Sequence, residues 1–109
     1  MFGNKLGKVA KAIEKGNAKV LVDLASDNDV EVKLAAIAGL GETGGEDATN
    51  FLITQLHDND SAIRIAVAKS LGVLGDMHTK AHVSAQMNKE TNPEVREALS
   101  KAMAGIKGY

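Results

Sequence analysis

The sequence predicts an all-α protein, an α-solenoid of about seven antiparallel helices in stacked pairs. Three observations predict it. Residues 58–75 join an acidic, turn-prone tripeptide to a helix-period apolar pattern that glycines close. The same pattern precedes this stretch in residues 27–41, and it returns in reduced form at nearly the same spacing in residues 92–103. A fixed period of about 20–50 residues indicates supersecondary units that stack on one another and share a continuous core.

The length of 109 residues indicates one domain, residues 1–109. Apolar residues make up 44% of the chain, but aromatic residues only 3%. We therefore expect a thin core of closely packed small side chains rather than a large enclosed pocket. The period divides the domain into repeat units of roughly 1–28, 29–59, 60–91 and a half repeat, 92–109.

The first helix is predicted over residues 4–15, with Asn4 as its N-cap and Gly16 as its stop. One face carries lysines, and the other is apolar at helical spacing, which predicts that it docks on the next helix as the cap of the solenoid. A second helix is predicted over residues 17–26, capped by Asn17. The apolar face of the first helix consists of Phe2, Leu6, Val9, Ala10 and Ile13. That of the second consists of Val20, Leu21, Leu24 and Ala25.

The third helix is predicted over residues 30–40, with Asp29 as its cap, because aspartate accepts hydrogen bonds from the first backbone N–H groups of a helix. Gly39 and Gly41 lower helix propensity, so we expect them at close approaches between packed helices. After a turn at residues 43–45, a fourth helix is predicted over residues 46–57, with acidic residues in its first turn. The inner residues of these two helices are Val32, Ala35, Ala36, Ile37, Leu40, Ala48, Phe51, Leu52 and Leu56.

The last three helices are predicted over residues 61–74, 77–90 and 93–106. Pro93 suits the first position of a helix. The sixth helix has no regular stripe, since its apolar positions are Ala81, Val83, Ala85 and Met87. The inner residues of the fifth are Ile63, Ala66, Val67, Leu71 and Leu74; those of the seventh are Val95, Ala98, Leu99, Ala102, Met103 and Ile106. Because the seventh lacks a partner helix, we expect Leu99, Met103 and Ile106 to be partly uncovered, and a homodimer through the solenoid ends is one hypothesis.

The repeated pattern Asp-x-x-Val-Arg-x-x-Ala-x-x-x-Leu-Gly resembles the short HEAT-like repeat associated with phycobilisome lyases. Residues 60–72 and 92–98 carry two copies, and residues 29–33 carry a third with lysine in place of arginine. The resemblance covers nearly the whole chain and implies the solenoid fold. In the family, the aspartate and arginine tie adjacent repeats together. This implies the same structural role for Asp29, Asp60, Arg64 and Arg96.

No motif in the sequence predicts catalysis, and no cofactor is expected. His78 and His82 have the i, i+4 spacing of a zinc-binding helix, but no glutamate follows the first histidine where a general base would stand. We expect a solvent-facing pair and no metal. Residues 39–44 carry the letters of a phosphate-binding loop, yet they end a helix instead of following a strand, so that interpretation fails. The chain is therefore interpreted as a non-enzyme.

The charge pattern disfavours nucleic-acid binding. Residues 1–20 hold five lysines and one glutamate, whereas residues 21–60 hold one lysine and nine acidic residues. Arg64 and Arg96 are the only arginines, so the arginine-rich patch of a duplex-DNA binder is absent from the sequence. The chain has no cysteine and no apolar run of about 18 residues. A cytoplasmic protein without a transmembrane segment is expected.

The leading hypothesis is a non-catalytic scaffold or adaptor that binds a protein or peptide on the concave face of the solenoid. That face is normally lined by the second helix of each pair, here residues 17–26, 46–57 and 77–90. The predicted contacts are Lys19, Asp23, Asn50, Thr54, His57, Lys80, Ser84 and Asn88. An assembly factor or subunit of a bilin lyase-type complex is the alternative that the family resemblance implies. A further alternative is weak binding of nucleic acid or a membrane surface through the lysine-rich first helix.

Overall fold

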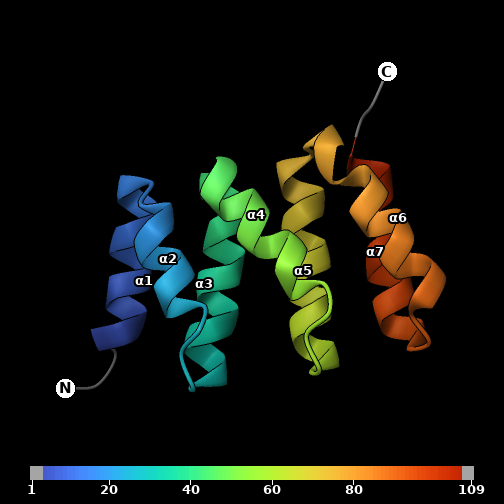
Figure 1. The fold of residues 1–109 in the computed structure, drawn as a ribbon. Helices are drawn as coiled ribbons and strands as arrows, with labels where there is room; N and C mark the ends of the chain where they lie inside the picture. Colours follow the sequence, from blue (N-terminus) through green and yellow to red (C-terminus); the bar gives the residue numbers. More distant parts are fainter. Residues whose placement is uncertain (1–3, 107–109) are drawn as a thin grey trace.

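The computed structural model describes residues 4–106, and these residues form helices and turns without a β-strand. The predicted all-α solenoid is therefore confirmed (Figure 1). Within the described residues, no helix has the length and apolar character that a membrane crossing requires. The helices are α1 (Asn4–Lys15), α2 (Ala18–Leu24), α3 (Val30–Thr43), α4 (Glu46–Gln55), α5 (Ser61–Leu74), the 3-10 turn η1 (Met77–Thr79), α6 (Lys80–Lys89) and α7 (Pro93–Gly105).

The helices form two layers. In the first layer α1, α3, α5 and α7 lie side by side, and each packs on the next (Figure 1). In the second layer α2 lies over α1 and α3, α4 lies over α3 and α5, and α6 lies over α7. The extents of 42 × 28 × 17 Å fit a slab two helices thick, since packed helix axes are about 8–10 Å apart. The first layer is the more closely packed, because α2 and α4 make fewer contacts with each other and α4 and α6 scarcely touch.

Glycines bring the helices of the first layer together. A Cβ atom on Gly72 of α5 would lie 3.0 Å from the Cα of Ala102 in α7, and one on Gly105 would lie 2.7 Å from the carbonyl oxygen of Gly72. A Cβ on Gly41 of α3 would lie 2.9 Å from the Cβ and Oγ of Ser70 in α5. The predicted close approach at Gly41 is confirmed. The Ser70 Oγ donates a buried hydrogen bond of 2.8 Å to the carbonyl oxygen of Ile37, which fixes α5 against α3.

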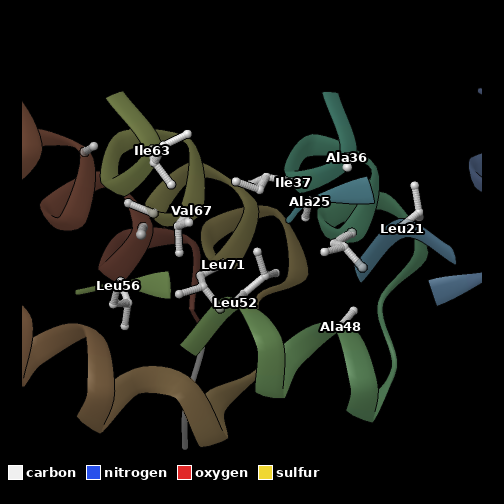
Figure 2. Packing of buried hydrophobic residues seen from close by; sticks show 14 of the residues in the cluster. Leu21, Ala25, Ala36, Ile37, Ala48, Leu52, Leu56, Ile63, Val67 and Leu71 are labelled. Atoms are coloured by element: carbon white, nitrogen blue, oxygen red, sulfur yellow. The ribbon is translucent and has the colours of Figure 1, made fainter. Parts of the chain in front are cut away.

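The hydrophobic core lies between the two layers, where side chains of α2 and α4 meet those of α3 and α5 (Figure 2). Its largest fully buried members include Leu21, Ile37, Leu52 and Leu71. These residues were all predicted to face inward. The core is built from Leu, Ile, Val and Ala, which explains how a chain with so few aromatic residues forms a continuous interior.

Several predicted core positions are wrong. On α1 the buried alanine is Ala12, and Ala10 is exposed, because α1 turns its 9–12–13 stripe toward α2 and α3. Val20 is 36% exposed. On α6, for which no regular stripe is predicted, Val83 is fully buried, Met87 is partly buried, and Ala81 and Ala85 face solvent. Phe2, assigned to the first apolar face, lies outside the described residues.

The expectation of an uncovered last helix is also wrong for two of its three residues. Leu99 is 0% exposed and Ile106 is 3% exposed, since both belong to the hydrophobic core and α7 packs on α5 and α6. Met103 is half-buried, as expected. The apolar side of α7 is therefore largely closed by its packing on α5 and α6.

The predicted caps Asn17 and Asp29 are confirmed, and Asp60 and Asn92 cap helices as well. The side chains of Asn17, Asp29, Asp60 and Asn92 each accept a hydrogen bond from a backbone N–H group in the first turn of the helix that follows. Asn4 is already part of α1 and not the residue that precedes it, so the prediction of Asn4 as the N-cap is wrong. Helix α3 continues to Thr43, beyond the predicted end at residue 40, because the packing of Gly41 against α5 outweighs the low helix propensity of glycine.

Candidate functional site

Arg64 and Glu90 form a partly buried ion pair that links α5 to the turn between α6 and α7. The Nε of Arg64 donates to Oε1 of Glu90 at 2.9 Å, and its Nη2 donates to Oε2 at 3.0 Å. The side chains are only 17% and 3% exposed. The remaining Nη1 donates to the carbonyl oxygens of Asp58 at 2.8 Å and Asn59 at 3.2 Å. One guanidinium therefore holds its own turn and the next hairpin together.

The Glu90 carboxylate accepts further hydrogen bonds. The Nε2 of Gln86 donates to it at 3.2 Å, and the backbone N–H of Asn92 donates at 3.2 Å. The Arg64 guanidinium, followed by these N–H groups, holds the pKa of Glu90 below its ordinary value, although burial opposes the shift. The Nδ1 of His57 lies 2.9 Å from Oε1 of Gln86, so the predicted contact residue His57 belongs to this network.

The resemblance implied that two aspartates and two arginines, Asp29, Asp60, Arg64 and Arg96, tie adjacent repeats together, but they do not all have this role. Arg64 ties adjacent units together, and the Nη1 of Arg96 donates to the carbonyl oxygens of Met87 at 2.6 Å and Glu90 at 3.0 Å. Asp29 and Asp60 do not tie units together: each caps its own helix, α3 and α5. The acidic partner instead stands in the turn itself, as Glu90 does for Arg64 and Asp27 for Lys5, whose Nζ lies 2.8 Å from Oδ2 of Asp27.

The other predicted contact residues lie on the second layer and do not converge. Lys19 and Asp23 line a shallow hollow with Val22 and Asp47, between α2 and α4. Asn50 lines a second hollow near the start of α6. His57 lines a third, beside Arg64 and Glu90. Thr54 donates its hydroxyl to the carbonyl oxygen of Phe51 within α4. On α6, Lys80 and Asn88 are exposed and Ser84 is half-buried. The structure thus spreads these residues over one face without joining them into one site.

The histidine pair has a structural explanation. The Nδ1 of His78 lies 2.9 Å from Oδ1 of Asp76, and the same oxygen accepts the backbone N–H of His78, so Asp76 caps the turn η1. These hydrogen bonds, the backbone one first, lower the pKa of Asp76. His82 lines the same hollow as His78. Within residues 4–106 no group of three or more histidine and acidic side chains is arranged to hold a metal ion.

A groove between α5 and α7 was not predicted. It has a volume of about 570 Å³, and small residues of the close helix contact, Gly72, Ala98 and Ala102, form part of its lining. Val73 projects beside it with 71% of its surface exposed. The other lining residues are Ile65, Lys69, Glu94, Glu97 and Lys101. In the sequence, Ile65 and Val73 fall outside the predicted inner stripe of the fifth helix, and Lys69 lies between them. Such a combination of solvent-facing apolar and charged residues was the signal that could have indicated the groove.

The comparisons with known proteins agree with this architecture. A family model for HEAT repeats matches residues 18–104. The comparison with curated proteins finds no match. The matched span begins at the first residue of α2 and ends one residue before the end of α7. It therefore contains the hairpins α2–α3, α4–α5 and α6–α7, and α1 precedes it.

Proposed function

Because this chain belongs to the HEAT-repeat family, we propose that it is a non-catalytic scaffold or adaptor that binds a protein or peptide. HEAT repeats generally mediate protein–protein interactions. The polar groups that come together here, above all Arg64 and Glu90, hold the repeats in place. Within the described residues every buried polar side-chain atom has a hydrogen-bond partner. The chemistry of these groups is thus accounted for by the fold.

We infer that the repeating unit is a hairpin of one second-layer helix followed by one first-layer helix, as in α4–α5. The family match begins with α2, which supports this division over units that begin at residues 1, 29, 60 and 92. Helices of the first layer are packed more closely than those of the second. Stacked hairpins that are closer on one side bend toward that side, so the concave face is expected on α3, α5 and α7.

The groove between α5 and α7 lies on that face, and it carries the proposal. Its lining offers Ile65, Val73 and the small residues to an apolar side chain. Its charges are separated along α7, since Glu94 and Glu97 come first and Lys101 follows, with Lys69 on α5. None of these four charged side chains forms an ion pair within residues 4–106. A peptide with an apolar residue between a basic end and an acidic end would complement the groove.

Two matched variants test this proposal against the earlier prediction for the second layer. Val73→Arg fills the groove from an exposed position, and the double variant Asn50→Arg, Thr54→Arg alters the exposed face of α4. Proteins captured from a lysate by each purified variant are compared with those captured by the parent chain, and circular dichroism checks that helicity is unchanged. We expect Val73→Arg to lose the specific captures while the α4 variant keeps them.

The other outcomes are equally informative. Loss with the α4 variant alone would place the partner on the surface of Lys19, Asp23, Asn50 and their neighbours. Specific capture that neither variant changes would contradict both surfaces. If the parent chain captures no protein specifically, the scaffold proposal itself fails.

One observation favours a second candidate function, weak binding to an anionic surface. Lys8, Lys11 and Lys15 on α1 are exposed, and Lys5 is 60% exposed although it pairs with Asp27. Co-sedimentation with anionic vesicles and with duplex DNA, each at two salt concentrations, separates the membrane from the nucleic-acid alternative. Absence of binding at low salt would remove both. For the bilin lyase-type alternative, the test is an absorbance change on mixing with tetrapyrroles.

A further inference from the structure

The exposed side of α7 has a residue pattern similar to that of the side of α5 that packs against α7. On α5, Arg64 and Gly72 both contact the last hairpin, and Ala68 lies between them on the same helical stripe, fully buried. The period places Arg96, Ser100 and Ala104 at the corresponding positions of α7, and all three are exposed. The last helix of the solenoid thus presents a helix-packing stripe with no helix of the described chain on it.

Arg96 is an open copy of the Arg64 link. The Nη1 of Arg64 donates to the carbonyl oxygens of the turn before α5, and the Nη1 of Arg96 donates to carbonyl oxygens ahead of α7, including that of Glu90. The Nε and Nη2 of Arg64 take up the Glu90 carboxylate. For Arg96 no carboxylate occupies this edge within residues 4–106. The hydrogen bonds of Nη1 therefore hold the Arg96 guanidinium in place, while its Nε and Nη2 groups are available, within the described residues, to donate to a carboxylate.

We propose that this surface, the exposed stripe Arg96–Ser100–Ala104 of α7, docks a helical hairpin of a partner protein. The partner presents an aspartate or glutamate to Arg96 from the turn before its second helix. The carboxylate fits the planar donor edge of the guanidinium in the same two-bond geometry as Glu90 on Arg64. Ser100 and Ala104 are both small, but Ala104 carries the Cβ atom that Gly72 lacks, so we expect the partner helix to pack slightly farther from α7 than α7 packs from α5.

The turns of this chain specify the chemistry of the partner. In each of three turns a carboxylate stands two residues ahead of the residue that caps the next helix and accepts its backbone N–H. The distances are 2.8 Å for Asp27, 2.8 Å for Asp58 and 3.2 Å for Glu90. A partner with an acidic residue at this position continues the existing α5–α7 interface by one more hairpin.

A second copy of the chain is a poor occupant. The opposite end of the solenoid is α1, which carries Lys5, Lys8, Lys11 and Lys15 with Glu14 as its one acidic residue. Stacking two copies head to tail would set these lysines against Arg96, and like charges disfavour that contact. The docking surface is also separate from the α5–α7 groove, so either can fail without the other.

The test extends the chain by one hairpin. A copy of residues 75–106 is fused directly after Ile106, which sets the glutamate of the copy 26 residues after Arg96, the same separation as between Arg64 and Glu90. The matched control carries glutamine in place of that glutamate in the copy alone. Arg96→Met is made in the parent, in the extended chain and in the control, and unfolding in urea is followed by circular dichroism.

We expect the extended chain to keep the helical signal per residue of the parent. Arg96→Met should lower its folding equilibrium constant about tenfold more than it lowers that of the parent, because a charge-assisted double hydrogen bond is lost. In the glutamine control this excess should fall to about threefold or less. An equal effect of Arg96→Met in all three chains, or a fused copy that stays unfolded, would overturn the proposal. Sedimentation of the parent completes the test, since a dimer that Arg96→Met dissociates would identify a second copy as the occupant.

Discussion

Removal of the Arg64 side chain should strongly destabilise the protein, because it strands a buried carboxylate. In Arg64→Met the aliphatic stem is kept, but Glu90, which is 3% exposed, loses both guanidinium donors and retains only Gln86 and the backbone of Asn92. Breaking a fully buried pair costs about 3–5 kcal/mol. Since Arg64 is 17% exposed, we expect about 2–3 kcal/mol in the free energy of unfolding. The corresponding fall in melting temperature is about 10–20 °C.

The effect should depend on pH in a defined direction. The hydrogen bonds from Arg64 keep the pKa of Glu90 in the folded protein below its ordinary value of 4.5. The stabilisation is therefore fully present above that value and is lost as the pH falls through the lower folded pKa. Urea unfolding at pH 7 and at about pH 3 should show a large difference between the parent and Arg64→Met at the higher pH and a much smaller one at the lower pH.

A double-mutant cycle supplies the control. Glu90→Gln removes the charge but keeps a hydrogen-bonding side chain, and should cost about 1–2 kcal/mol. In that background Arg64→Met should cost only about 1 kcal/mol, since no charge is left unpaired. If Arg64→Met costs less than about 0.5 kcal/mol, or if its cost is the same at both pH values, the interpretation of the pair as a link between repeats is wrong.

Three further predictions concern the contacts that set the helix spacing and the helix ends, each measured by thermal or urea unfolding. Gly72→Ala should lower the free energy of unfolding by about 1–2 kcal/mol, because its Cβ would lie 3.0 Å from a backbone atom of α7. Gly7→Ala, which has open space around it, should raise the free energy of unfolding by about 0.5–1 kcal/mol, and equal effects would contradict the close approach. Ser70→Ala should cost about 1 kcal/mol through loss of its buried hydrogen bond to Ile37, and a neutral result would remove that contact from the account. Asp60→Ala should cost about 1 kcal/mol and Asp60→Asn far less; similar losses would argue against capping.

Most of the fold could be predicted from the sequence because its signals are local and repeated. The nearly constant repeat period, the capping residues Asp29, Asp60 and Asn92, and the apolar stripes of α3, α5 and α7 are readable within short windows. The errors concern helices whose inner side is set by neighbours. Helix α6 has no regular stripe, so which of its alanines face solvent depends on how it lies across α7. The burial of Leu99 likewise depends on tertiary packing.

The link from Arg64 to Glu90 shows why the candidate site was harder to predict than the fold. The arginine stands in the repeated pattern, but its partner is 26 residues away in a turn, where the other turns carry Asp27 and Asp58. Aspartate and glutamate at that position form the same backbone hydrogen bond, but their basic partners differ, since Glu90 pairs with Arg64 and Asp27 pairs with Lys5. A pairing of this kind depends on side-chain reach and helix spacing, which the residue pattern does not contain.

Which face of the solenoid is concave depends on which helix begins each repeat, and the repeat period alone does not give this. The observed period is equally compatible with pairs that begin at α1 and with pairs that begin at α2, but the two choices exchange the inner and outer helices. The contacts that favour the second choice are the close approaches of Gly41 to Ser70 and of Gly72 to Ala102, which draw the first layer together. No comparable contact joins α4 to α6. If the layer with the shorter spacing is the concave one, as we propose, a partner should contact the helices that carry the repeated arginines, and the variants at Val73 and Asn50 distinguish that face from the opposite one.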